Sequence, residues 1–277
     1  MSENEKKLFC EMNPVFYAIS ERKGIITRCL KNIFGGTKFA HEIDAKRLPN
    51  VVSSHHSHLI KKGPGIDPEL QYNKATNIDL ACRTFNGLIV HPGQVFSFWV
   101  CVGNPCKRRG YKEGRVIEGE NLIHGVGGGL CNLGNTVHLV VLHSPLEVIE
   151  LHHHSDALAA DPGGVRVPYS AGTSVSYNYI DFRFRNNTDQ DVQLCAWVEG
   201  EELYAELRSE REFPYTYELQ EEGHHFHKEG DDYYRIGKIY KVTKDRATGE
   251  VINRELNWDN HSKVMFTHDQ IPPEQIR

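Results

Sequence analysis

Long apolar runs are missing from this chain of 277 residues. Nowhere do roughly 18 apolar residues follow one another, so we predict no membrane-spanning helix. The first residues, MSENEKKLFC, are mostly polar or charged, and no apolar segment of secretory length follows them. The seven cysteines are scattered, and no CxxC pair is present. Scattered cysteines without an export signal are typical of reduced thiols, and we therefore expect a cytoplasmic protein.

A strong excess of one charge is also missing. Lys and Arg total 32 and Asp and Glu total 37, which gives a net charge of −5 with neutral histidine. This mild acidity argues against a nucleic-acid-binding protein, which would normally carry a basic stripe. The first 40 residues differ from this average, because 7 basic and 4 acidic side chains give them a charge of 7 − 4 = +3. They predict a basic amphipathic segment that could contact the inner face of an anionic membrane, with a solvated helix face as the alternative.

The pattern of apolar residues divides the chain into three parts. Residues 1–70 are expected to form a basic, partly helical lead-in, residues 71–210 the core domain, and residues 211–277 a small C-terminal β extension. Apolar spacing predicts helices over 73–88 and 131–143, and alternation predicts strands over 95–102, 146–151, 173–185, 192–198 and 203–207. A Ser-rich stretch with His55, His56 and His58 is expected to be a polar turn. We therefore predict an α+β fold, with a mixed, mainly antiparallel sheet and one helix packed on its face.

The segment from His124 to His154 is the best candidate for a functional site. Its 31 residues hold six of the sixteen histidines and the densest group of glycines, followed directly by Cys131. Glycine-rich backbone that leads into a helix presents free N–H groups and the positive end of the helix dipole. Such a position is expected to lower the pKa of the Cys131 thiol, and its N–H groups could bind an oxyanion. The residues proposed to bind the oxyanion are Gly127, Gly128, Gly129 and the side-chain amide of Asn132.

Element lengths then predict a partner for Cys131. The helix over 131–143 rises roughly 20 Å, and the strand over 146–151 returns by roughly the same length. Residues 152–154 would therefore arrive level with Cys131, and His152 and His154 would point the same way. We favour His154 as the general base, with His152 as the alternative. Asp181 or Asp156 could orient the imidazole, and the spacing does not select between them.

Other interpretations of these residues stay open. Cys131 could be a buried structural cysteine. A zinc ion held by Cys131, His152 and His154 is chemically allowed, but no recognised ligand spacing supports it, so we predict no metal and no cofactor. The glycine loop fits neither a Walker A nor a GxGxxG motif. Arg108, Arg109 and Arg115 could bind a substrate carboxylate or lie on the solvated surface.

Several motifs in the chain resemble the VanW family. They are NGLIVHPGQVFSFW (86–99), GYKEG (110–114), GVGGGLCNLGN (125–135), HS (154–155) and YIDFRFRNNTD (179–189), with a weaker likeness at QYNK (71–74). The resemblance implies a vancomycin-resistance and cell-wall context, with a small molecule or peptide related to peptidoglycan as the substrate. The chain departs from the family motif at Asn132 and Gly134, where Gln and Ser are usual.

Two hypotheses follow from the residues and the resemblance together. The first is a cysteine-dependent amide hydrolase or acyl transferase acting on peptidoglycan-like peptides or precursors. The second is a non-enzymatic module that binds a carboxylate- or phosphate-bearing wall precursor at the helix N-terminus.

Overall fold

A computed structural model describes residues 14–63, 66–118, 121–153, 156–157 and 172–277. Within these ranges it contains four α-helices and strands that are almost all antiparallel, so the expected α+β class is confirmed. The strands form several sheets instead of the single mixed sheet that we expected. None of the described helices is long and apolar enough to span a membrane.

The central sheet is formed by four strands in the order β1-β10-β9-β2. The expected hairpin is present as β9 (Val192–Glu199) and β10 (Glu202–Ser209). The strands β1 (Asn50–His58) and β2 (Leu88–Val90) pair antiparallel with β10 and β9. Alternate residues of β10 are buried, as expected for a strand with one face on the core.

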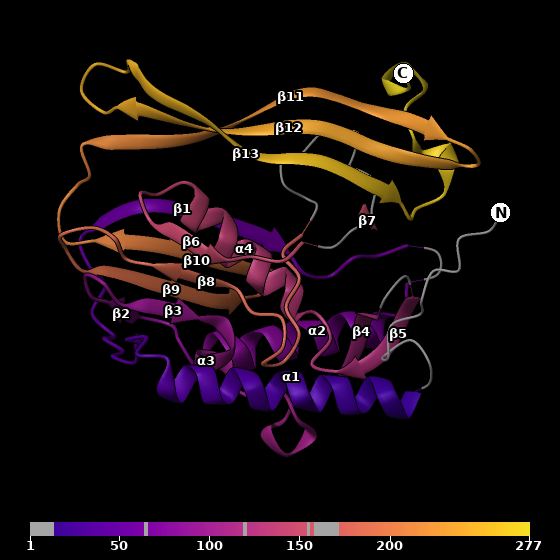
Figure 1. The fold of residues 1–277 in the computed structure, drawn as a ribbon, viewed down its shortest axis with the longest axis horizontal. Coiled ribbons are helices and arrows are strands. Elements are labelled where there is room, and N and C mark those ends of the chain that lie inside the picture. The colour runs from indigo at the N-terminus through magenta and orange to yellow at the C-terminus, as the bar shows by residue number, and fades with distance from the viewer. Residues whose placement is uncertain (1–13, 64–65, 119–120, 154–155, 158–171) are drawn as a thin grey trace.

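The helix α4 (Leu130–Leu142) is covered on two sides. One side packs on β1 and β10 of the central sheet. On the other side, Leu139 and Leu142 contact Ile239 of the C-terminal sheet. That sheet contains β11 (Tyr215–Glu229), β12 (Asp232–Asp245) and β13 (Val251–Val264), with the short β7 (Asp156–Ala157) parallel to β13. Figure 1 shows it lying over α4, on the opposite side of the molecule from α1 (Pro14–Phe34).

A second, smaller sheet has the order β3-β8-β6. Its strands are β3 (Val95–Ser97), β6 (Glu147–Glu150) and β8 (Arg183–Arg185). Stacked Phe96 and Phe184, with ring centroids 4.9 Å apart, join this sheet to the core. The remaining elements are α2 (Pro68–Cys82), α3 (Phe98–Val102), the hairpin β4 (Glu113–Glu118) and β5 (Asn121–Val126), and the 3-10 turns η2 (Lys107–Arg109), η4 (His268–Gln270) and η5 (Pro273–Gln275).

Four of the expected elements are corrected by the structure. The strand expected over 95–102 stops at Ser97, whose hydroxyl accepts from the Val100 N–H and starts α3. The helix expected over 73–88 starts earlier, because Asp67 caps it and Pro68 occupies its first turn, and it ends at Cys82. The polar turn expected around 53–58 belongs to β1.

The strand expected over 173–185 keeps only its last three residues. A turn between Ser176 and Ile180, with Asn178 at φ 45°, interrupts the alternating pattern. The division at residues 70 and 210 stays a prediction.

Candidate functional site

The glycine loop before α4 is pressed against β4. Gly129 is the N-cap of α4 with φ 101°, a left-handed conformation that favours glycine. A Cβ on Gly128 would lie 2.4 Å from the carbonyl carbon of Gly114, so any side chain at position 128 would collide with the β4 backbone. The loop therefore needs glycine for its shape and for its contact with β4.

Asn77 holds the loop in place from α2. Its side-chain Nδ2 donates to the carbonyls of Gly128 and Lys112, each at 3.0 Å, and its Oδ1 accepts from the Lys112 N–H at 2.7 Å. The side chain is fully buried, and all three of these bonds are to backbone. Asn77 thus ties α2, the start of β4 and the glycine loop together. This role of Asn77 was not predicted, although a polar side chain next to the apolar stripe of the helix is a signal for it.

Lys74 crosses the N-cap of α4. A Cβ on Gly129 would lie 2.2 Å from the Lys74 Cγ, so the lysine stem rests directly on the glycine. Its ammonium donates to the side-chain oxygen of Gln71 at 3.0 Å. Burial, together with the smaller effect of the neighbouring charges of Lys61 and Arg115, lowers the pKa of Lys74 to about 8. Gln71 and Lys74 begin and end the QYNK stretch, to which the sequence analysis assigned no role.

Cys131 lies in the first turn of α4, as predicted. Its Sγ donates to the Val175 carbonyl at 3.5 Å, and the side chain packs against the apolar core. Burial raises the pKa of the Cys131 thiol above its ordinary value. The expected lowering is therefore wrong, because loss of solvation outweighs the helix dipole here.

Two segments of the chain, at residue 152 and at residues 174–175, lie beside each other near Cys131. The carbonyl of His152 accepts from the Ser174 N–H at 2.7 Å, and the next residue, Val175, accepts from Cys131. The His152 side chain is exposed, with Nε2 3.3 Å from a Glu150 oxygen. His154, our preferred base, lies outside the described residues. Among the described side chains no hydrogen bond joins Cys131 to an imidazole.

Two further histidines of this region are His138 and His153. His138 is buried on α4, with Nδ1 3.0 Å from the Thr173 hydroxyl. Burial lowers its pKa to about 3, helped by the nearby charges of His153 and Lys241. The His153 ring packs against Trp258 of β13 at a tilt of 34°, with centroids 3.4 Å apart. The His153 ring therefore lies between His138 of α4 and Trp258 of the C-terminal sheet.

Asp181 forms its hydrogen bonds with residues other than these histidines. One carboxylate oxygen accepts from the Ser97 hydroxyl at 2.5 Å and the Arg183 guanidinium at 2.6 Å. The other accepts from the backbone N–H groups of Trp99 and Phe182 at 3.1 and 3.0 Å. The side chain is fully buried and joins the start of α3 to β8. The structure thus does not bring Asp181 to the imidazoles, and the side chain of Asp156 is outside those described.

The predicted oxyanion donors are only partly in place. The Gly127 N–H donates to the Lys112 carbonyl at 3.0 Å, which removes one of the expected donors. The Asn132 side chain turns toward β1, where its Nδ2 lies 3.4 Å from the Ser57 hydroxyl. Gly128 and Gly129 remain at the amino end of the helix, beside Lys74.

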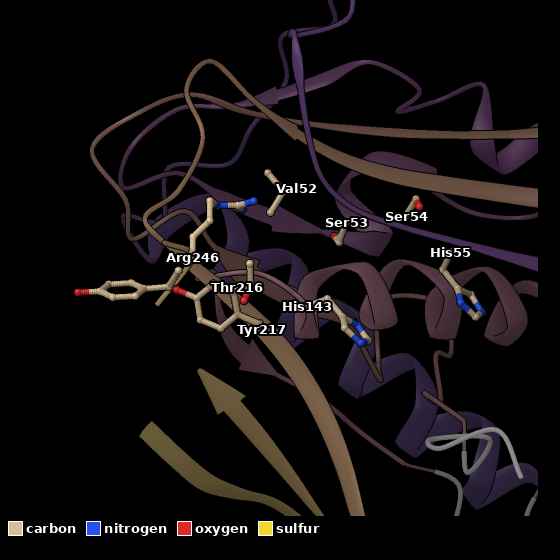
Figure 2. Close-up of a pocket in the computed structure, with 9 residues that line it drawn as sticks. Val52, Ser53, Ser54, His55, His143, Thr216, Tyr217 and Arg246 are labelled. Carbon is tan, nitrogen blue, oxygen red and sulfur yellow. The ribbon is translucent and has the colours of Figure 1, made fainter. Parts of the chain in front are cut away.

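A groove of about 340 Å³ opens at the other end of α4. It lies between β1 and the start of β11, and Figure 2 shows the side chains of His143, Thr216 and Arg246 among those that line it. None of the predicted site residues lines it; its lining residues are Val52, Ser53, Ser54, His55, His143, Tyr215, Thr216, Tyr217 and Arg246. The part of the chain that the structure describes holds no group of three or more His, Cys, Asp or Glu side chains placed to bind a metal.

Comparison with known proteins identifies the family. Residues 73–208 match the family model described as VanW like protein. The chain is 28% identical over 233 residues to the Vancomycin B-type resistance protein VanW of Enterococcus faecalis, which covers 84% of each chain. It is also 28% identical over 137 residues to the uncharacterized protein YoaR of Bacillus subtilis, covering 50% of this chain and 43% of that protein. No solved structure matches. The chain is therefore VanW-like over residues 73–208, and its likeness to VanW extends beyond them.

Proposed function

We propose that this VanW-like protein binds a carboxylate- or phosphate-bearing ligand at the amino end of α4. The observation that carries the proposal is the placement of Lys74, whose partly buried side chain lies across the N-cap glycine of that helix. Backbone N–H groups and the helix dipole at this position favour an anion, as does a nearby ammonium group.

The charges around Lys74 support the same ligand class. Lys61 and Arg115, the two charged groups that act on Lys74, are both cations, and both side chains are exposed. Three positive groups therefore gather around one helix end. A bound anion would offset their repulsion and replace the solvation that Lys74 has lost.

The relative in Enterococcus faecalis bears the name of a vancomycin-resistance protein, and this name suggests the source of the anion. Cell-wall precursors carry both candidate groups, a terminal peptide carboxylate and a nucleotide-linked diphosphate. We propose such a precursor as the ligand. The cytoplasmic location and the absence of a nucleic-acid partner stay predictions from the sequence.

Calorimetric titration with a peptide that ends in D-Ala-D-Ala tests the proposal. The carboxylate of the peptide stays charged from about pH 6 to about pH 9. A change of affinity with pH in this range would therefore come from titration of the protein. We expect Lys74→Met to weaken binding about tenfold or more, because a charge-assisted hydrogen bond is lost. Affinity should fall as pH rises through about 8, where Lys74 loses its proton, and this fall should be absent in Lys74→Met.

A matched variant controls for net charge. Lys228→Met removes one positive charge from β11, and we expect it to bind like the unchanged protein. A nucleotide-linked muramyl pentapeptide, titrated in parallel, separates recognition of the phosphate from recognition of the carboxylate. Equal affinity of Lys74→Met and Lys228→Met for both ligands would refute the proposal.

A second candidate function is cysteine-dependent amide chemistry at the same place. It is favoured by the position of Cys131 in the first turn of α4, directly after the glycine loop. In this proposal the Cys131 sulfur attacks the amide carbonyl, while His154 or His152 takes the thiol proton and passes it to the leaving amine. Water then hydrolyses the thioester, and Asp181 acts only through the fold that it stabilises.

Cys131→Ser distinguishes the two functions. Retained binding with lost turnover of an amide substrate would support catalysis, whereas retained binding with no turnover by the unchanged protein would support the binding module. Iodoacetamide labelling independently tests the burial of the Cys131 thiol. Because burial raises the thiol pKa, Cys131 should react more slowly at about pH 8 than the same residue in denaturant.

A further inference from the structure

The first helix of the structure turns its apolar side chains outward. Six large apolar residues of α1 have between 50% and 79% of their surface exposed, and Figure 1 shows the helix along an outer side of the molecule. They are Val15, Ile19, Ile26, Leu30, Ile33 and Phe34. At 3.6 residues per turn these side chains fall within a sector of about 100°. They form one continuous stripe, which we call the outer stripe.

Polar contacts hold the opposite side of α1 to the protein. Arg28 donates two hydrogen bonds to the Glu150 carboxylate, at 2.7 and 2.5 Å. The Asn32 side chain accepts from Arg183 at 2.8 Å. The helix is thus anchored through polar groups, so the outer stripe is not the face that it uses to pack on the protein.

Positive charge accompanies the outer stripe. The helix contains four basic residues and one acidic residue, a balance of 4 − 1 = +3. Arg28 is used in the contact with Glu150, whereas Arg22, Lys23 and Lys31 are exposed. The helical spacing places Lys23 within the stripe and Arg22 about 20° outside one edge. An apolar stripe with basic borders is typical of helices that lie in the plane of a membrane surface.

We propose that α1 binds the surface of an anionic lipid membrane through the outer stripe. The apolar side chains would enter the boundary between headgroups and acyl chains, and Arg22, Lys23 and Lys31 would contact lipid phosphates. The charge balance favours lipid over a second copy of this chain, because pairing two such stripes would bring two positive surfaces together. The basic residues within the helix agree with a position on the membrane surface.

Sedimentation with lipid vesicles tests this proposal. We expect the protein to bind vesicles containing phosphatidylglycerol at least about tenfold more strongly than vesicles of phosphatidylcholine alone, and added salt should weaken the binding. The double variant Ile26→Glu/Leu30→Glu should lose binding by at least about tenfold. Both positions are exposed, so the variant should keep the fold, which circular dichroism would check.

An exposed apolar residue elsewhere provides the control. Leu256 of β13 is 51% exposed, close to the 50% of Leu30, and Leu256→Glu should bind vesicles like the unchanged protein. Equal binding to neutral and anionic vesicles, or binding by the Ile26→Glu/Leu30→Glu variant as strong as that of the unchanged protein, would overturn the proposal. So would a dimer in analytical ultracentrifugation that the double variant abolishes, without any binding to vesicles.

Discussion

The helices α1 and α4 differ in where their apolar side chains go. Ten of the 13 residues of α4 are buried, between the central sheet on one side and the C-terminal sheet on the other. In α1 six large apolar residues face outward, and the polar side chains of Arg28 and Asn32 bond to the protein. Both helices contain apolar residues at helical spacing. Spacing therefore identifies the apolar side of a helix, but it does not tell which surface covers that side.

The two helices also differ in how their charged groups are used. On α1 the guanidinium of Arg28 is neutralised by Glu150, and the other basic groups are exposed. At the start of α4 the charges come from other elements, with Lys74 of α2 and Arg115 of β4 near the N-cap. The first arrangement suits a broad anionic surface, and the second suits a single anionic group.

The largest expected difference comes from truncating one leucine in each helix. Leu133 of α4 is fully buried, and Leu133→Ala should cost about 2 to 5 kcal/mol in the free energy of unfolding. Leu30→Ala in α1 removes the same atoms from an exposed position and should cost no more than about 0.5 kcal/mol. Urea denaturation of both variants measures the two costs. Similar costs would mean that the outer stripe is covered within the protein.

A change of pH should reveal another difference between the two helices. The helix α4 contains His138, whereas α1 contains no histidine. Burial lowers the pKa of His138 to about 3, whereas in the unfolded chain it should be near 6.5. The unfolded chain therefore binds more protons between these values, and stability falls as pH falls below about 6.5. At about pH 5 the expected loss is about 2 kcal/mol.

Urea denaturation of the unchanged protein and of His138→Asn, at about pH 7.5 and at about pH 5, checks this expectation. The variant should lose less stability than the unchanged protein over this interval, whatever its stability at neutral pH. An equal loss in the two proteins would show that His138 does not titrate as a buried neutral imidazole.

A smaller effect is expected from removing the anchor of α1. Arg28→Ala breaks a partly buried, charge-assisted pair with Glu150 and should cost about 1 to 2 kcal/mol, mainly as local opening of the helix. Hydrogen exchange of the α1 amides measures this opening. Arg83→Ala, which removes an exposed ion pair with Asp79 four residues away, should cost no more than about 0.5 kcal/mol. If Arg28→Ala leaves α1 exchange unchanged, as Arg83→Ala should, other contacts must hold the helix.

Much of the fold could be predicted from local patterns in the sequence. The helix over 131–143 and the hairpin after residue 192 were predicted within two residues of their observed bounds, because their apolar spacing and their breakers agree. The elements that were predicted wrongly are those in which two local preferences compete. At Ser97 a side-chain cap outweighs the β preference of the aromatic residues that follow, and at Asn178 a turn interrupts an alternating stretch.

The α+β class, the glycine loop and the place of Cys131 at the start of a helix follow from the amino-acid pattern alone. Only the tertiary structure decided the surroundings of that cysteine, since the Thr173–Val175 segment and the core remove its solvation and raise its pKa. The tertiary structure also placed Lys74 on Gly129 and bonded Asp181 to Ser97 and Arg183. It left the outer stripe of α1 exposed. The physical reason is that burial and charge proximity depend on residues distant in the chain, whereas helix spacing and turns depend on neighbours.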